Sequence, residues 1–120
     1  MPTVLLVEDN EMNRDMLLRR LQRKGFDVLT ANDGEEALRM TRQHLPAVVL
    51  MDMSLPVLDG WEATRRLKAD PSTRHIPVIA LTAHALPAER DRAIEAGCCA
   101  FETKPIDFPK LLAVMEAAQK

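Results

Sequence analysis

The sequence lacks the features that mark several large classes of protein. No apolar run approaches the roughly 20 residues that span a membrane, and the N-terminus leads straight into a strand-like segment with no signal peptide. The formal net charge is only −2, so no surface for a polyanion is indicated. We therefore expect a cytoplasmic protein that binds neither a membrane nor, directly, a nucleic acid.

Cysteine is scarce, and the two cysteines present, Cys98 and Cys99, are adjacent. Adjacent cysteines rarely bridge, and their spacing fits no metal site, so we interpret both as reduced packing residues. The chain has 120 residues, of which 47% are hydrophobic and 28% charged. This composition is typical of one globular domain. Since repeats and linkers are also missing, we predict a single domain over residues 1–120.

The elements that are present alternate between strand and helix five times. Three apolar runs show no polar–apolar alternation, which indicates parallel strands covered on both faces. Strands are expected at about 3–8, 27–31, 47–52, 76–81 and 98–102. Helices are expected at about 11–24, from the cap Asp33 to about 44, after the loop marked by Pro56, Asp59 and Gly60 to about 69, at 87–96, and after the cap Asp107. This order predicts an α/β fold with a parallel sheet and helices on both faces.

Reactive side chains follow four of these strands where each one ends, and we expect them in one pocket at the carboxyl edge of the sheet. They are Glu8 and Asp9, Asp52, Thr82, and Lys104. Clustered carboxylates repel one another unless a cation lies among them, and a hard divalent ion prefers oxygen ligands. The hydroxyl and the ammonium are then available to hold an anion such as a phosphoryl group.

The helix over residues 87–96 is the weakest predicted element. Its apolar residues are essentially Ala88, Ala93, Ile94 and Ala96, which can bury little surface. Because apolar burial contributes only ~25 cal/mol per Å², this helix is expected to be loosely held. A loosely held helix beside a reactive site is where a switch can act.

Five motifs in order make the chain resemble the receiver domain of bacterial two-component response regulators, the chemotaxis-regulator-like family. The motifs are Val7-Glu8-Asp9-Asn10, residues 50–56 around Asp52, Asp59-Gly60, Leu81-Thr82-Ala83, and residues 101–105. The resemblance covers essentially the whole chain. It implies a doubly wound, flavodoxin-like, five-stranded parallel sheet in the order 2-1-3-4-5 with five helices.

The resemblance also assigns a phosphoacceptor and a metal site. Asp52 resembles the acceptor that becomes an aspartyl phosphate, a known type of covalent nucleophile. Glu8 and Asp9 resemble the acidic pair that holds Mg²⁺, together with the carboxylate of Asp52 and the main-chain carbonyl of Ser54. Mn²⁺ is an alternative ion for the same oxygen ligands.

Further positions match the family's switch residues. Thr82 resembles the hydroxyl that binds a phosphoryl oxygen, and Lys104 resembles the counter-charge. A cis peptide bond is implied between Lys104 and Pro105. Phe101 occupies the position of the switch aromatic, with plain packing as the alternative. Ser54 and His84 match positions that tune dephosphorylation, although His84 can equally be an exposed loop residue.

The implied function is a phosphorylation-dependent signalling switch. A histidine kinase or a histidine phosphotransfer protein would phosphorylate Asp52, and the face formed by the fourth helix, fifth strand and fifth helix would change for an unknown downstream protein. The chain would be no enzyme beyond its own phosphoryl transfer and dephosphorylation, and a monomer or a phosphorylation-dependent dimer. The alternative is a phosphorelay carrier, or a non-switching receiver scaffold within a larger sensor protein.

Two other classes fit the sequence less well. A Mg²⁺-dependent phosphohydrolase of the haloacid-dehalogenase-like type needs a second aspartate two residues after the nucleophile, where this chain has Ser54. A flavodoxin-like FMN protein needs a phosphate loop after the first strand, where the acidic Glu8, Asp9 and Glu11 would repel a phosphate.

Overall fold

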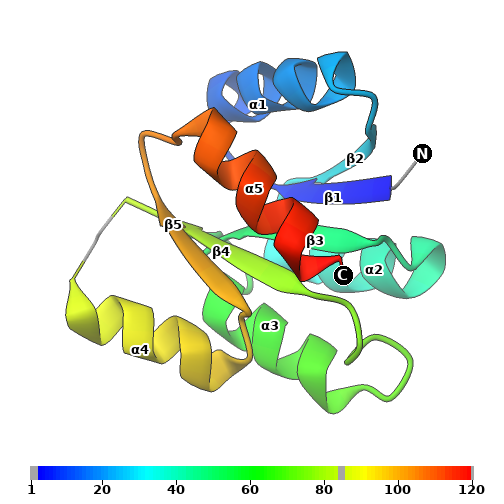
Figure 1. Cartoon of the computed structure of the whole chain (residues 1–120). Helices are drawn as coiled ribbons and strands as arrows, with labels where there is room; N and C mark the ends of the chain where they lie inside the picture. The colour runs from blue at the N-terminus through cyan, green and yellow to red at the C-terminus, as the bar shows by residue number, and fades with distance from the viewer. Residues whose placement is uncertain (1–2, 84–85, 120) are drawn as a thin grey trace.

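A computed structural model of the chain describes residues 3–83 and 86–119. Five parallel strands form one sheet in the order β2-β1-β3-β4-β5. Helices α1 and α5 cover one face, and α2, α3 and α4 cover the other (Figure 1). This arrangement confirms the predicted fold class, including the strand order. None of the helices described has both the length and the apolar composition needed to cross a bilayer.

The element bounds are close to those predicted. The strands are Thr3–Val7 (β1), Asp27–Ala31 (β2), Val48–Asp52 (β3), Val78–Thr82 (β4) and Ala100–Thr103 (β5). The helices are Glu11–Arg23 (α1), Gly34–His44 (α2), Gly60–Ala69 (α3), Pro87–Ala96 (α4) and Phe108–Ala118 (α5).

The apolar strands divide their side chains between two cores. In β1, Leu5 and Val7 pack under α2, α3 and α4, whereas Val4 and Leu6 pack under α1 and α5. β3 and β4 alternate in the same way, and all of their residues are buried. A strand buried on both faces has no reason to alternate polar with apolar residues, which explains the runs in the sequence.

Side-chain caps set where most helices begin. Asn10, Asp33, Asp59 and Asp107 each accept a hydrogen bond from the main-chain N–H three residues later. Each bond satisfies a donor that the first turn leaves unpaired. The start of α4 is different, because Leu86 provides no side-chain cap and only Pro87 favours the first turn.

The start of the fifth strand was predicted two residues too early. Gly97 has a φ of 110°, and the N–H groups of Gly97 and Cys98 donate to carbonyls of α4. Cys98 therefore belongs to the C-terminal cap of the helix, and the strand starts at Ala100. Cys98 is buried, as expected for a packing residue, but Cys99 is exposed, so that half of the prediction is wrong.

The strand order determines at which point of the sheet the reactive side chains meet. The chain passes from β1 outward to β2 and then returns to β3 on the other side of β1, so the connection reverses between β1 and β3. In open parallel sheets ligands bind at such a point, beyond the carboxyl ends of the strands. Glu8 directly follows β1 and Asp52 ends β3, so both lie at this reversal.

Candidate functional site

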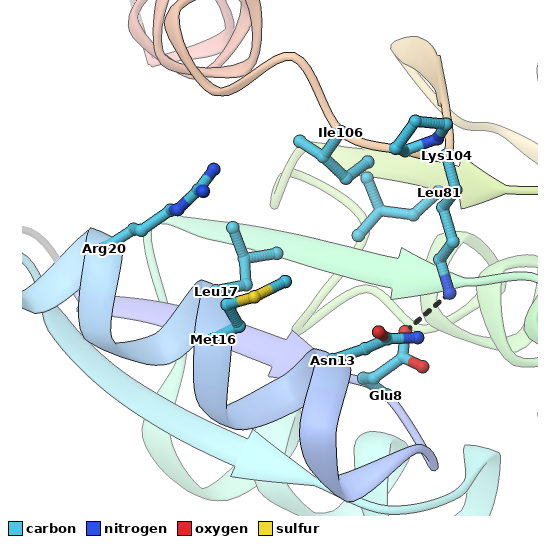
Figure 2. Close-up of a pocket in the computed structure, with 9 residues that line it drawn as sticks. Glu8, Asn13, Met16, Leu17, Arg20, Leu81, Lys104 and Ile106 are labelled. Atoms are coloured by element: carbon cyan, nitrogen blue, oxygen red, sulfur yellow. Dashed lines mark hydrogen bonds and ion pairs between the residues drawn. The ribbon is translucent and has the colours of Figure 1, made fainter.

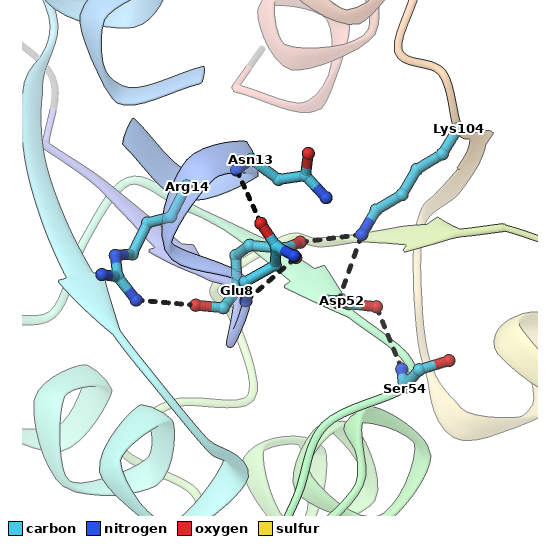
Figure 3. Close-up of polar contacts among 7 residues, drawn as sticks. Glu8, Asn13, Arg14, Asp52, Ser54 and Lys104 are labelled. Atoms are coloured by element: carbon cyan, nitrogen blue, oxygen red, sulfur yellow. Dashed lines mark hydrogen bonds and ion pairs between the residues drawn. The ribbon is translucent and has the colours of Figure 1, made fainter. Parts of the chain in front are cut away.

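Lys104 joins the two buried carboxylates at the reversal point. Its Nζ lies 2.8 Å from Oε2 of Glu8 and 3.2 Å from Oδ2 of Asp52 (Figure 3). Its main-chain N–H donates to the carbonyl of Thr82 at 2.7 Å, which ties the end of β5 to the end of β4. Three residues that are far apart in the sequence therefore form one charged cluster.

Asp52 is buried, and each of its carboxylate oxygens has a donor. Oδ1 accepts from the main-chain N–H of Ser54 at 3.0 Å, while Oδ2 faces Lys104. The α3 helix begins very close to this strand end, since a Cβ on Gly60 would lie 2.4 Å from the carbonyl oxygen of Asp52. Only glycine fits there, so the Asp59-Gly60 motif holds α3 against the end of β3.

Burial and the neighbouring charges oppose one another in setting the protonation of the cluster. Burial raises the pKa of Glu8 above its ordinary value, and the Asp52 carboxylate adds to this, while Lys104 opposes it. For Lys104, burial acts to lower the pKa, but the carboxylates of Glu8 and Asp52 outweigh it and the pKa is raised. The ammonium is therefore held in its charged form.

The acidic cluster also has the chemistry of a divalent-metal site. One carboxylate oxygen from each of Glu8, Asp9 and Asp52 lies within 4.8 Å of the others. Asp9 is exposed, so an ion held by these oxygens would keep contact with solvent. Oxygen ligands and retained waters suit Mg²⁺, and Mn²⁺ accepts similar ligands. The residues present therefore fit the predicted ion.

The structure describes three of the four other predicted residues, Thr82, Phe101 and Ser54. Thr82 is buried at the end of β4. Phe101 is half-buried in β5, where it pairs in register with Ala80 and packs against the core under α2, α3 and α4. Ser54 is exposed, and His84 lies outside the described residues. The peptide bond between Lys104 and Pro105 is cis.

Sequence reasoning missed a cavity that opens beside the acidic cluster. It has a volume of about 520 Å³ and lies between α1 and the segment after β5 (Figure 2). Its lining includes Glu8 and Lys104 at one end and the apolar Met16, Leu17 and Ile106. Met16 is 55% exposed, so this side chain of α1 lines the cavity and does not belong to the core.

Comparison with known proteins gives one consistent result. The sequence profile of the response regulator receiver domain matches residues 4–116. The polar-differentiation response regulator DivK of Brucella anthropi is 38% identical over 115 residues, which cover 96% of this chain and 94% of that protein.

Solved structures give the same result. The receiver domain of sensor histidine kinase PA1611 from Pseudomonas aeruginosa PAO1 has a magnesium ion coordinated in its active-site cleft. It is 36% identical, with a TM-score of 0.92 and coverage of 98% of this chain and 97% of that one. Chemotaxis protein CheY4 of Vibrio cholerae is 28% identical, with a TM-score of 0.92 and 98% of each chain covered.

Proposed function

The chain belongs to the response regulator receiver domain family of two-component signalling, and from this premise we propose that it is a switch operated by phosphorylation of Asp52. The observation that carries the proposal is the position of Asp52: a buried carboxylate at the end of a central strand, with Oδ2 3.2 Å from the Lys104 ammonium. A phosphoryl group on that oxygen would have its counter-charge already in place.

The donor in this proposal is a phosphohistidine on a histidine kinase or a histidine phosphotransfer protein. Oδ2 of Asp52 attacks the phosphorus, a P–O bond forms, and the P–N bond breaks. The electron pair of that bond stays on the imidazole nitrogen of the partner, which takes up a proton. Lys104 stays beside the transferred group and balances part of its charge.

Mg²⁺, or Mn²⁺ in its place, would be held by Glu8, Asp9, the carboxylate of Asp52 and the main-chain carbonyl of Ser54. A bound divalent ion neutralises charge on a phosphoryl group during transfer. The grouping of the three carboxylates supports this assignment, as does the magnesium ion in the cleft of the similar Pseudomonas receiver domain.

The response is proposed to pass through Thr82. The strand end that carries Thr82 is bonded to Lys104 through the main chain, so both groups that would contact the phosphoryl group are connected. When Thr82 moves toward that group, Phe101 follows inward and the face of α4, β5 and α5 changes for a downstream protein. In this proposal the chain catalyses no reaction other than the gain and loss of its own phosphoryl group. Ser54 and His84 tune the rate of that loss.

Small phosphodonors test the acceptor assignment without knowledge of the partner. With Mg²⁺ and acetyl phosphate, intact-mass spectrometry should show one added phosphoryl group, stable in acid and labile in base. Asp52→Asn should abolish it, because an amide is no nucleophile here. Asp59→Asn is the matched control, since the asparagine keeps the helix cap that Asp59 provides for α3.

The assignment of Asp52 is wrong if the phosphoryl group maps to another residue in peptide digests. It is equally wrong if Asp52→Asn and Asp59→Asn are phosphorylated to the same extent.

A further inference from the structure

We propose that Arg14 is a positioning residue for the metal site, because it fixes the main chain of Glu8 by linking it to Asn32. The inference rests on the proposed function, since it concerns how the chain arranges the carboxylates that hold the divalent ion. It assigns a role to two residues that do not themselves reach the site.

The linkage consists of two hydrogen bonds from one guanidinium nitrogen. Nη1 of Arg14 donates to the main-chain carbonyl of Glu8 at 3.3 Å and to Oδ1 of Asn32 at 2.5 Å. Figure 3 shows Arg14 reaching from α1 to the carbonyl of Glu8, on the side of that residue away from Lys104. Arg14 is half-buried and Asn32, the residue after β2, is exposed.

Glu8 depends on this linkage because it lies beyond the last residue of β1. Its main-chain N–H donates to the carbonyl of Ala31 at 3.1 Å, and its carbonyl accepts from Arg14, which Asn32 holds. Both main-chain polar groups of Glu8 are thus tied to the end of β2. Its side chain is then directed at Lys104, and the peptide that follows carries Asp9.

Positioning and simple charge predict opposite effects for Arg14. A guanidinium close to an acidic cluster repels a divalent cation, so if charge alone mattered, its removal would strengthen metal binding. If Arg14 fixes the ligand-bearing main chain, its removal weakens metal binding. Groups that orient metal ligands typically account for 10–100-fold in affinity. The sign of the change therefore separates the two roles.

The test is a calorimetric Mg²⁺ titration of the full chain, with no phosphodonor present. Arg14→Ala and Asn32→Ala are each expected to raise the dissociation constant of Mg²⁺ roughly ten-fold, and the double variant should be no worse than either single one. Asn32→Asp keeps an oxygen that accepts from Arg14, so it should restore binding. Arg19→Ala, an exposed arginine on the same helix, is the matched control and should bind as the wild type does.

The outcomes separate the inference from the proposed function. Unchanged or tighter Mg²⁺ binding by both Arg14→Ala and Asn32→Ala overturns the positioning role while the wild type still binds Mg²⁺. If the wild type binds no Mg²⁺ and acquires no phosphoryl group on Asp52, the proposed function itself fails. Should Arg14→Ala not fold, the pair Asn32→Ala and Asn32→Asp decides alone, because the side chain of Asn32 is exposed.

Discussion

Glu8 and Asp52 are each only 4% exposed, and the ammonium of Lys104 contacts both carboxylates. From the sequence, the crowding of carboxylates indicated a divalent cation and left the lysine available for an anion. The structure shows that Lys104 already balances part of this charge. A bound metal ion would therefore compete with an existing ion pair and would not simply relieve a repulsion.

Arg14 shows what the sequence could not reveal at this scale. The five reactive residues of the site lie at the last position of a strand or just after it, so their meeting point could be predicted from topology. Arg14 instead lies among several arginines on α1, and nothing in its spacing separates it from Arg19. Its role depends on the hydrogen bond to Asn32, a residue 18 positions away that comes close only when the chain folds. Neither the sequence of α1 nor that of the segment after β2 indicates this contact.

A pH-dependent contribution to stability is expected from Cys98. Burial raises the pKa of its thiol to about 11 from 9.0. In the unfolded chain the thiol loses its proton near pH 9, while the folded chain keeps it, so stability is fully present below pH 9 and falls as the pH rises to about 11. Two units correspond to roughly 2–3 kcal/mol.

The measurement is the free energy of unfolding in urea between pH 8 and pH 11. Cys98→Ala should show a shallower decline than the wild type, whatever its stability at pH 8. Cys99→Ala is the comparison: burial also raises the pKa of this thiol, but by less than that of Cys98, so its loss should flatten the decline less. Equal slopes for the wild type and Cys98→Ala would contradict the prediction.

At the scale of whole elements, α4 is even less anchored than its composition suggests. The prediction counted four apolar residues, but only Ala93 and Ala96 are buried, whereas Ile94 is 58% exposed and Ala88 is exposed. A contact with α3 adds to this packing: the guanidinium of Arg92 lies 4.5 Å from the ring centroid of Trp61. Trp61 itself is buried.

The contact between Arg92 and Trp61 is expected to hold α4 against α3. A cation–π contact at an exposed site contributes about 0.5–1 kcal/mol. Loss of this free energy raises the equilibrium constant for local opening of α4 about 2–5-fold. Arg92→Leu should therefore speed amide hydrogen exchange in α4 by the same factor. Arg90→Leu, an exposed arginine on the same helix, should leave the exchange of α4 unchanged. Equal exchange in both variants would assign no role to the contact.

The switch is expected to act on this loosely held helix. With Mg²⁺ and beryllofluoride, which mimics the phosphoryl group, amide exchange should change in α4 and β5, and first in α4, because few apolar contacts resist the movement of this helix. Thr82→Ala should lose most of this change while Asp52 still accepts a phosphoryl group from acetyl phosphate. If α4 responds equally in Thr82→Ala and the wild type, the response does not pass through this hydroxyl.

For the molecule as a whole, the sheet order is what makes the site. Glu8 and Lys104 lie 96 positions apart and meet only because β1, β3, β4 and β5 end at one edge. The alternation of elements and the buried character of the central strands could be predicted from the sequence, and the strand order followed from the family resemblance. The cavity beside α1 could not be predicted from the sequence, because the residues that line it come from segments that are distant in sequence.

Because Lys104 joins three strand ends, its charge should matter for global stability. Lys104→Met keeps most of the apolar stem but leaves Glu8 and Asp52 close together without their counter-ion. Breaking a buried ion pair costs about 3–5 kcal/mol, and the Lys104 side chain is 24% exposed. We therefore expect the free energy of unfolding in EDTA to fall by about 1–3 kcal/mol.

Mg²⁺ should then stabilise Lys104→Met more than it stabilises the wild type, because the ion replaces the lost counter-charge and binds only the folded chain. Lys110→Met is the matched control. This lysine is 67% exposed and lies 3.8 Å from Glu102 in an ion pair at the surface, so its loss should cost less than about 1 kcal/mol and leave the Mg²⁺ effect unchanged. Urea unfolding with and without Mg²⁺ measures both quantities. If Lys104→Met and Lys110→Met lose the same stability in EDTA, the ammonium of Lys104 does not hold the acidic cluster together.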